Sequence, residues 1–438
     1  MTVTASRLGA SPLTVDWSNL IRPIPHADST KQQAISEAWS KLKSRFETGE
    51  IGFFDTPIKD DISQREASEH LARELIAEQR FTDCLFLGIG GSSLGPKSLL
   101  SALQERCGQK ITFHFVDNPD PLVWHSTLAT LKPNATFVCV VTKSGTTFET
   151  IAQLLLALNW LGKECYKNLV AITDPAKGDL KAFATKEGIK TLSIATSVGG
   201  RFSVFTPVGL FAAALAGLST VDFLNGAKTI RDYVEKTPPE RNVLFLIANE
   251  LIVKNKTHPV HVCMPYSTRL RVVSDWFVQL WGESLGKDGK GFTPLAAVGA
   301  TDQHSLLQLL RDGPDDKVTF FLKVDKVENE VTIPRLATFS RDAQYPSFKL
   351  LENHSLHELM NIEYMATSMV LTKRGRPNLT IGLDQLDEKT MGALFFAFSV
   401  LTAITGTLMS VNPFDQPGVE EGKIYIRDSL RSTAAITI

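Results

Sequence analysis

The 438-residue sequence has little of what marks several large functional classes. Its 46 Lys and Arg residues are balanced by 47 Asp and Glu, a formal net charge of −1, so nothing suggests a surface for nucleic acid or an anionic membrane. It has no His, Asp or Glu spacing typical of a metal site, and the phosphate-binding pattern G-x-x-x-x-G-K-[ST] is absent. We therefore expect the ligand to be a small polar metabolite, bound without a metal or other cofactor.

Cysteine is also scarce. The five cysteines are an odd number without C-x-x-C spacing, and most lie in apolar runs. They are Cys84, Cys107, Cys139, Cys165 and Cys263. We interpret them as small core residues in a reducing compartment. The N-terminal residues 1–17 lack a basic stretch followed by an apolar one, so no signal peptide is predicted and a cytoplasmic location is expected.

Long apolar runs are almost absent as well. The longest, MGALFFAFSVLTAITGTLM at residues 391–409, has the length of a membrane span. It contains several Gly, Ser and Thr residues, and the rest of the chain alternates as a globular α/β protein does. We predict a buried helix here.

From about residue 50 the chain alternates between short β-branched runs and helical stretches, which is typical of a parallel sheet covered on both faces. Strands are predicted at residues 84–89, 111–117, 136–142, 168–174 and 189–195, and then at 259–267, 294–300, 318–324 and 379–383. The fold class is α/β, with two tandem doubly wound parallel-sheet domains. We predict an irregular arm and one helix in residues 1–50, a first domain at 51–215, and a second at 216–438 with a C-terminal helical segment. The ligand is expected in the crevice between the domains, at the carboxyl ends of the strands.

One turn, in the stretch VVTKSGTTFET at residues 140–150, lies between a predicted strand and a predicted helix. Its polar residues are Thr142, Lys143, Ser144, Thr146 and Thr147. Thr146 and Glu149 form a capping-box pattern, so the helix is expected to begin there. A single Ser or Thr at such a place is usually a cap, but one cap needs one hydroxyl. The group is therefore predicted to bind an anion, with phosphate as the natural guest of a helix N-terminus.

A glycine-rich turn, GIGGSSLGP at residues 88–96, follows the first predicted strand. Ser93 stands where a dinucleotide-binding fingerprint would need glycine. Asp117 could imitate the ribose-binding acid of that fold, so a nicotinamide enzyme remains an alternative. We favour the interpretation that Gly90 and Gly91 let the backbone approach a ligand while Ser92 donates a hydrogen bond to it.

Five further polar residues stand out by their surroundings. Arg201 follows paired glycines and precedes an apolar helix, so it is expected to be partly buried and to stabilise negative charge. Glu283 lies near a helix C-terminus, where the dipole disfavours a carboxylate, which makes it a candidate base. His304 lies just inside a helix that follows an apolar strand, and a turn rich in Asn, Pro, Asp and Gly carries Gln416 and Lys423. Taken singly, each of these side chains is more often structural or solvated.

Taken in order, the motifs resemble those of the glucose-6-phosphate isomerase (phosphoglucose isomerase) family. They are GIGGSSLGP, TKSGTTFET, GGRFSVFTPVGL, GES before GK, TDQHSLLQLL and DQPGVEEGK. The resemblance covers about residues 85–425, and the length resembles the shorter bacterial members. It implies two domains of the sugar-isomerase type, reversible isomerisation of glucose 6-phosphate and fructose 6-phosphate in glycolysis and gluconeogenesis, and no metal. It also implies a homodimer in which the active-site histidine crosses the interface.

The resemblance also assigns roles to the residues. Glu283 matches the base that moves a proton between carbons 1 and 2, and Arg201 matches the arginine that steadies the enediol. His304 matches the ring-opening group, which Lys423 assists, and Gln416 matches a sugar contact. The phosphate anchors are Thr142, Ser144 and Thr147, with Lys143 and Ser92 beside them. A base, a ring-opening group and a cation are what migration of a carbonyl requires.

Two departures from the family pattern concern the substrate pocket. The phosphate turn reads SGTT where many members have TFTT, and Ser93 stands where Asp is common. Two alternatives to the isomerase stay open. One is a non-catalytic sugar-phosphate sensor, which would have no need of Glu283, His304 and Lys423. The other is an isomerase with a broader hexose 6-phosphate preference, for example one that accepts mannose 6-phosphate.

Overall fold

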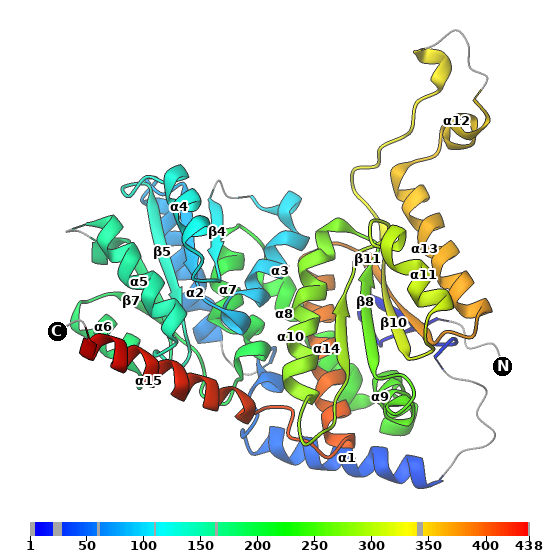
Figure 1. The fold of residues 1–438 in the computed structure, drawn as a ribbon, viewed down its shortest axis with the longest axis horizontal. Coiled ribbons are helices and arrows are strands. Elements are labelled where there is room, and N and C mark those ends of the chain that lie inside the picture. The colour runs from blue at the N-terminus through cyan, green and yellow to red at the C-terminus, as the bar shows by residue number, and fades with distance from the viewer. Residues whose placement is uncertain are drawn as a thin grey trace.

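The computed structural model contains two sheets, each covered by helices, and the predicted α/β class is confirmed (Figure 1). The structure describes residues 5–20, 29–58, 62–108, 111–162, 165–339 and 345–436.

The first sheet has five parallel strands in the order β4-β3-β5-β6-β7. They are β3 (Asp83–Leu87), β4 (Thr112–Val116), β5 (Thr136–Val141), β6 (Leu169–Thr173) and β7 (Lys190–Ser193). Every residue of β5 and β6 is buried, as expected for inner strands of a parallel sheet with both faces covered. All five strands predicted for this domain are therefore present.

Helices cover both faces of the first sheet. On one face lie α4 (Pro121–Thr130), α5 (Phe148–Leu161) and α6 (Asp179–Lys186); on the other lie α2 (Ile62–Ala77), α3 (Leu94–Ala102) and α7 (Pro207–Leu215). Alternate residues of one strand serve the two faces, because side chains in a strand point to opposite sides. Val138 and Val140 of β5 pack with Leu154 of α5, whereas Phe137 and Cys139 belong to the cluster on the other face.

The second sheet has six strands in the order β1-β2-β11-β10-β8-β9. Four are parallel and were predicted: β8 (Val260–Pro265), β9 (Thr293–Ala296), β10 (Lys317–Lys326) and β11 (Asn378–Gln385). The antiparallel pair β1 (Ser6–Arg7) and β2 (Leu13–Asp16) completes the edge beside β11. The prediction of an irregular arm was wrong for these residues. Leu13 and Val15 face the core and Thr14 and Asp16 do not, an alternation typical of a half-buried strand that the sequence analysis missed.

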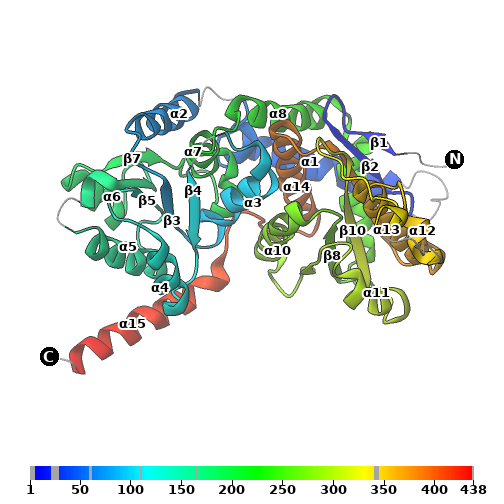
Figure 2. The same cartoon turned by 90° about the horizontal axis from the view of Figure 1, so that it is seen from above.

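The helices of the second half are α8 (Thr220–Lys236), α9 (Val243–Lys254), α10 (Arg271–Leu285), α11 (Gln303–Asp312), α12 (Pro346–Leu351), α13 (Leu356–Lys373), α14 (Glu388–Leu408) and α15 (Glu420–Ile436). Most of them surround this sheet, whereas α12 projects away from it and α15 runs beside the first domain (Figures 1 and 2). The N-terminal helix α1 (Ser29–Glu47), which was predicted, contacts α14. Among the described helices α14 is long and apolar enough to cross a membrane, but 89% of its apolar window is buried inside the protein. The prediction of a buried helix is confirmed.

The two halves share one core. A single apolar cluster contains Phe86 of the first sheet, Phe320 of the second and Phe396 of α14. Such a shared core fixes the position of one sheet relative to the other, and with it the geometry of any crevice between them. The predicted domain boundary near residue 215 coincides with the end of α7 and stays a prediction.

Candidate active site

A cavity of about 770 Å³ lies where the carboxyl edge of the first sheet meets the end of α10 and the start of α15. Nine of the ten predicted site residues line it: Ser92, Thr142, Lys143, Ser144, Thr147, Arg201, Glu283, Gln416 and Lys423. The first domain contributes from the loops after β3, β5 and β7, as the strand-end rule predicts. Only His304 of the predicted set lies elsewhere.

Three hydroxyls converge at the turn after β5. Thr142 Oγ1 lies 2.8 Å from Thr147 Oγ1 and 3.4 Å from Ser144 Oγ, and Ser144 Oγ lies 3.5 Å from Thr147 Oγ1. Gly145 takes a left-handed φ of 70°, which turns the chain back on itself here. The three hydroxyls and the backbone N–H groups at the start of α5 form a neutral donor set for an anion.

The predicted capping box is wrong. The helix α5 begins at Phe148 with Thr147 as its N-cap, and the Thr147 side chain makes no capping hydrogen bond. Thr146 directs its backbone N–H and its hydroxyl to Ser144 Oγ, each at 3.3 Å. Because the hydroxyls do not cap the helix, they remain available to a ligand.

Lys143 points away from the hydroxyls. Its Nζ donates to the carbonyl oxygens of Thr196 at 2.7 Å and Val198 at 2.8 Å. Burial lowers the pKa of this ammonium group, and the charge of Asp174 partly opposes that shift. The side chain thus joins the hydroxyl turn to the loop after β7, although it still lines the cavity.

One of the paired glycines has a role in packing that was not expected. A Cβ on Gly91 would lie 2.3 Å from the carbonyl carbon of Gly200, so the glycine allows two loops of the protein to meet. This contact sets Ser92 beside the loop that carries Arg201. Gly90 and Gly91 also line the cavity, so the expectation that they let the backbone approach a ligand stays a prediction.

The nicotinamide alternative is not supported. Asp117, the candidate ribose-binding acid, forms an ion pair with Lys97 at 2.9 Å and does not line the cavity. Among the residues described, no group of three His, Cys, Asp or Glu side chains could hold a metal ion.

Arg201 is buried more completely than the predicted partial burial, and all of its N–H groups donate hydrogen bonds within the protein. Its five hydrogen bonds run to Ser284 Oγ (2.6 Å), Glu283 Oε1 (3.1 Å), Gln416 Oε1 (2.7 Å) and the carbonyl oxygens of Pro413 (2.6 Å) and Asp415 (3.0 Å). Burial lowers the pKa of the guanidinium, and the carboxylates of Glu283 and Asp415 oppose that shift. The group therefore links the end of α10 to the chain that leads into α15.

Glu283 lies two residues before the end of α10, as predicted. One carboxylate oxygen accepts from Arg201 and the other accepts from Gln279 Nε2 at 3.0 Å. Its side chain is 24% exposed, on the cavity wall. Sequence reasoning missed Gln279, although its spacing of four residues before Glu283 places both on one face of the helix.

His304 lies apart from the cavity. It is the second residue of α11 and is exposed. Glu283 precedes β9 and His304 follows it, so the two lie at opposite ends of the second sheet. The second domain therefore supplies Glu283 from the amino end of its strands, contrary to the strand-end expectation.

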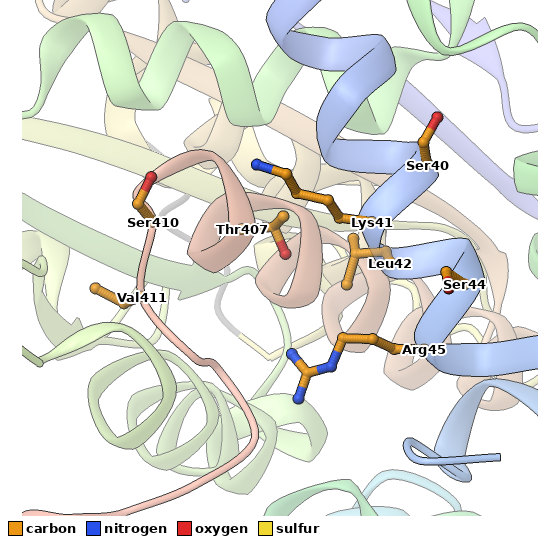
Figure 3. A pocket seen from close by; sticks show the side chains of 8 residues that line it. All are labelled: Ser40, Lys41, Leu42, Ser44, Arg45, Thr407, Ser410 and Val411. Atoms are coloured by element: carbon orange, nitrogen blue, oxygen red, sulfur yellow. The ribbon is translucent and has the colours of Figure 1, made fainter. Parts of the chain in front are cut away.

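A second hollow, of about 660 Å³, lies between α1 and the end of α14 (Figure 3). Its lining is Ser40, Lys41, Leu42, Ser44, Arg45, Thr407, Ser410 and Val411. The Arg45 guanidinium is already bound to Glu50 and Asn412. None of the predicted site residues lies here.

The fold and the cavity define an α/β protein with a turn of three convergent hydroxyls at one wall and a paired carboxylate and guanidinium at the other. Residues 72–437 match the phosphoglucose isomerase family. The chain is 37% identical to the glucose-6-phosphate isomerase of Carboxydothermus hydrogenoformans, covering 94% of this chain and 93% of that one. It is 42% identical to that of Rubrobacter xylanophilus, covering 81% and 85%.

Solved structures show the same fold. A hypothetical protein of Thermus thermophilus superposes with a TM-score of 0.86 at 35% identity, covering 95% of this chain and 99% of that one. A glucose-6-phosphate isomerase of Chlamydia trachomatis has the same fold, with a TM-score of 0.81 at 23% identity, covering 98% and 90%. The chain belongs to the phosphoglucose isomerase family.

Proposed function

We propose that this chain interconverts glucose 6-phosphate and fructose 6-phosphate in the cavity between its domains. The observation that carries the proposal is the Glu283 carboxylate, held 3.1 Å from the Arg201 guanidinium in a cavity whose other wall presents three convergent hydroxyls. The relatives named as glucose-6-phosphate isomerases match along most of their length.

Each wall has one task. The hydroxyls of Thr142, Ser144 and Thr147 and the start of α5 bind the phosphate and so fix the sugar chain. Glu283 takes the proton from carbon 2 of the open-chain aldose and returns it to carbon 1, while the hydroxyl proton moves from oxygen 2 to oxygen 1. Arg201 stabilises the negative charge of the enediolate between the two steps.

Arg201 and Gln279 also orient the base. Each holds one oxygen of Glu283, so the carboxylate cannot rotate freely. A base fixed in this way meets the carbon-bound proton without a further entropic cost. Gln416 and Lys423, which line the cavity where α15 begins, contact the sugar hydroxyls and assist ring opening.

His304 opens the ring from a second copy of the chain. It is exposed and outside its own cavity, so a homodimer with a shared active site would supply it. Mixing inactive Glu283→Gln and His304→Ala homodimers tests this. A hybrid dimer has one complete site, so random exchange should restore about a quarter of the wild-type activity. If each chain uses its own His304, the mixture stays inactive.

A cytoplasmic location fits the four cysteines whose side chains are described, because all four are free and three are buried. The experiment that tests the function is a coupled assay of the purified protein with glucose 6-phosphate and with fructose 6-phosphate, without added metal. Turnover in both directions is expected. Mannose 6-phosphate, assayed in parallel, tests the broader preference, and absence of turnover on every substrate would instead favour a sugar-phosphate sensor.

A further inference from the structure

The charges around the cavity are poorly matched to a phosphorylated ligand. Its cations are Lys143, Arg201, Lys423 and Arg427, and its carboxylates are Glu149, Asp174, Glu283, Asp415 and Glu420. The formal balance is −1, and the hydroxyl turn adds only neutral donors. A phosphate group carries nearly two negative charges at neutral pH, and hydrogen bonds from a cation bind it more strongly than those from neutral donors.

Three of the four cations already have partners. Arg201 makes five hydrogen bonds, Lys143 holds the carbonyl oxygens of Thr196 and Val198, and Lys423 forms an ion pair with Glu420 at 2.7 Å. Moving Arg201 or Lys143 onto a ligand would leave buried acceptors without donors, which costs free energy. Lys423 is exposed, and its pairing with Glu420 offsets its charge.

Arg427 differs from these three. It lies on α15, one turn after Lys423, and its side chain lines the same cavity as the hydroxyl turn. It makes no hydrogen bond and no ion pair with any part of the chain that the structure describes. Figures 1 and 2 show α15 running beside the first domain, on the side of α5, which is where the hydroxyl turn lies.

Two carboxylates on the cavity wall are stabilised by groups other than Arg427. Asp174 accepts hydrogen bonds from the backbone N–H groups of Ala176 and Lys177. Glu149 lies in the first turn of α5, where the helix dipole stabilises a negative charge. Both would repel an incoming phosphate, which strengthens the need for a positive group facing the turn.

We infer that Arg427 is a further substrate-binding residue, whose guanidinium binds the phosphate group of the sugar opposite the hydroxyls of Thr142, Ser144 and Thr147. The inference rests on the proposed function for the identity of the ligand. A guanidinium suits this task because it donates two parallel hydrogen bonds to one phosphate and keeps its charge at every relevant pH. It reaches the ligand from α15, whereas the hydroxyls reach it from the first domain.

The test compares Arg427→Gln with Arg431→Gln. Arg431 lies one turn further along α15, is exposed and does not line the cavity, so it controls for the loss of one positive charge on the helix. In Arg427→Gln the KM for fructose 6-phosphate should rise by about 10- to 100-fold with kcat changed less than about twofold, because phosphate binding is shared by substrate and transition state. The control should keep the wild-type KM.

Inorganic phosphate serves as a second probe, by calorimetric titration and as a competitive inhibitor. Arg427→Gln should weaken the binding of inorganic phosphate by the same factor as it raises the KM. Arg427→Lys should restore part of the phosphate affinity, because lysine supplies the positive charge but not the planar pair of N–H donors. An unchanged KM and phosphate affinity in Arg427→Gln, or a fall in kcat alone, would overturn the inference. Inactivity of the wild type on both sugar phosphates would instead refute the proposed function, and phosphate titration would still test Arg427.

Discussion

The substitution Arg201→Lys examines whether the guanidinium fork organises the active site. Arginine donates five hydrogen bonds here from three nitrogens, to acceptors on α10 and on the chain before α15. A lysine ammonium donates at most three from a single nitrogen, so at least two bonds are lost. Two such bonds would cost about 3–6 kcal/mol if fully buried, and solvent at the exposed Asp415 and Gln416 lowers the expected loss of unfolding free energy to about 2–4 kcal/mol.

The same change should slow catalysis. The Glu283 carboxylate loses its planar partner, and the positive charge that stabilises the enediolate is no longer held in a fixed position, for which a fall in kcat of about 10²–10³ is expected. Urea denaturation followed by tryptophan fluorescence measures the first effect, and the coupled assay measures the second. Both should be seen in the same purified protein.

Arg45→Lys is a matched control, because Arg45 binds the same chain segment before α15 from a more exposed position. Arg45 binds Glu50 at 2.7 Å and Asn412 at 3.3 Å, and its side chain is 29% exposed. Arg45→Lys should therefore change the unfolding free energy far less and leave kcat at the wild-type value. If Arg201→Lys behaves like Arg45→Lys in both measurements, the fork does not hold the site together and the reasoning is refuted.

Two further predictions concern the hydroxyl turn and a buried histidine. The double substitution of Ser144 and Thr147 by Ala should raise the KM for fructose 6-phosphate more than it lowers kcat, and an unchanged KM would remove the phosphate site from this turn. His261 is fully buried, accepts a hydrogen bond from Trp281 Nε1 at 3.0 Å, and has its pKa lowered by burial to about 3. Because the unfolded chain takes up a proton near pH 6.5 and the folded one does not, this histidine should lower the unfolding free energy by about 1.4 kcal/mol between pH 7.5 and 5.5. Denaturation curves should show that the unfolding free energy of His261→Asn, which keeps an acceptor for Trp281, falls by about 1.4 kcal/mol less between these pH values than that of the wild type. Equal falls in both proteins would contradict the lowered pKa of His261.

The inner parallel strands could be predicted because a strand buried on both faces of a sheet consists of an uninterrupted apolar run. Residues 136–141 read TFVCVV, an uninterrupted apolar run that suits an inner parallel strand. The strand at residues 13–16 has no such run, and it pairs with β11, more than 360 residues further along the chain, which local sequence does not reveal. Local pattern also failed at Thr146, where a capping box was expected and the turn geometry directs the side chain to Ser144 instead.

The site residues were identified by motif, but their partners were not. The sequence marks Lys143 as a cation in the phosphate turn, yet its ammonium group lies on two carbonyl oxygens of another loop. Gln279 and Arg427 carry no motif, and only the folded chain brings them to the cavity with Glu283. Packing between segments that are far apart in the sequence decides which polar groups are hydrogen-bonded within the protein and which remain available to a ligand.

The central claim is that Glu283 moves the proton between carbons 1 and 2, and isotope exchange tests it most directly. Glutamine at this position keeps the size of the side chain and an oxygen for Arg201 but cannot accept the proton, so kcat should fall by about 10²–10⁴ while KM changes little. With fructose 6-phosphate in heavy water, proton NMR should show the wild type placing deuterium at carbon 2 of glucose 6-phosphate, and Glu283→Gln should show none over the same period. Exchange at the wild-type rate in Glu283→Gln would mean that another residue is the base.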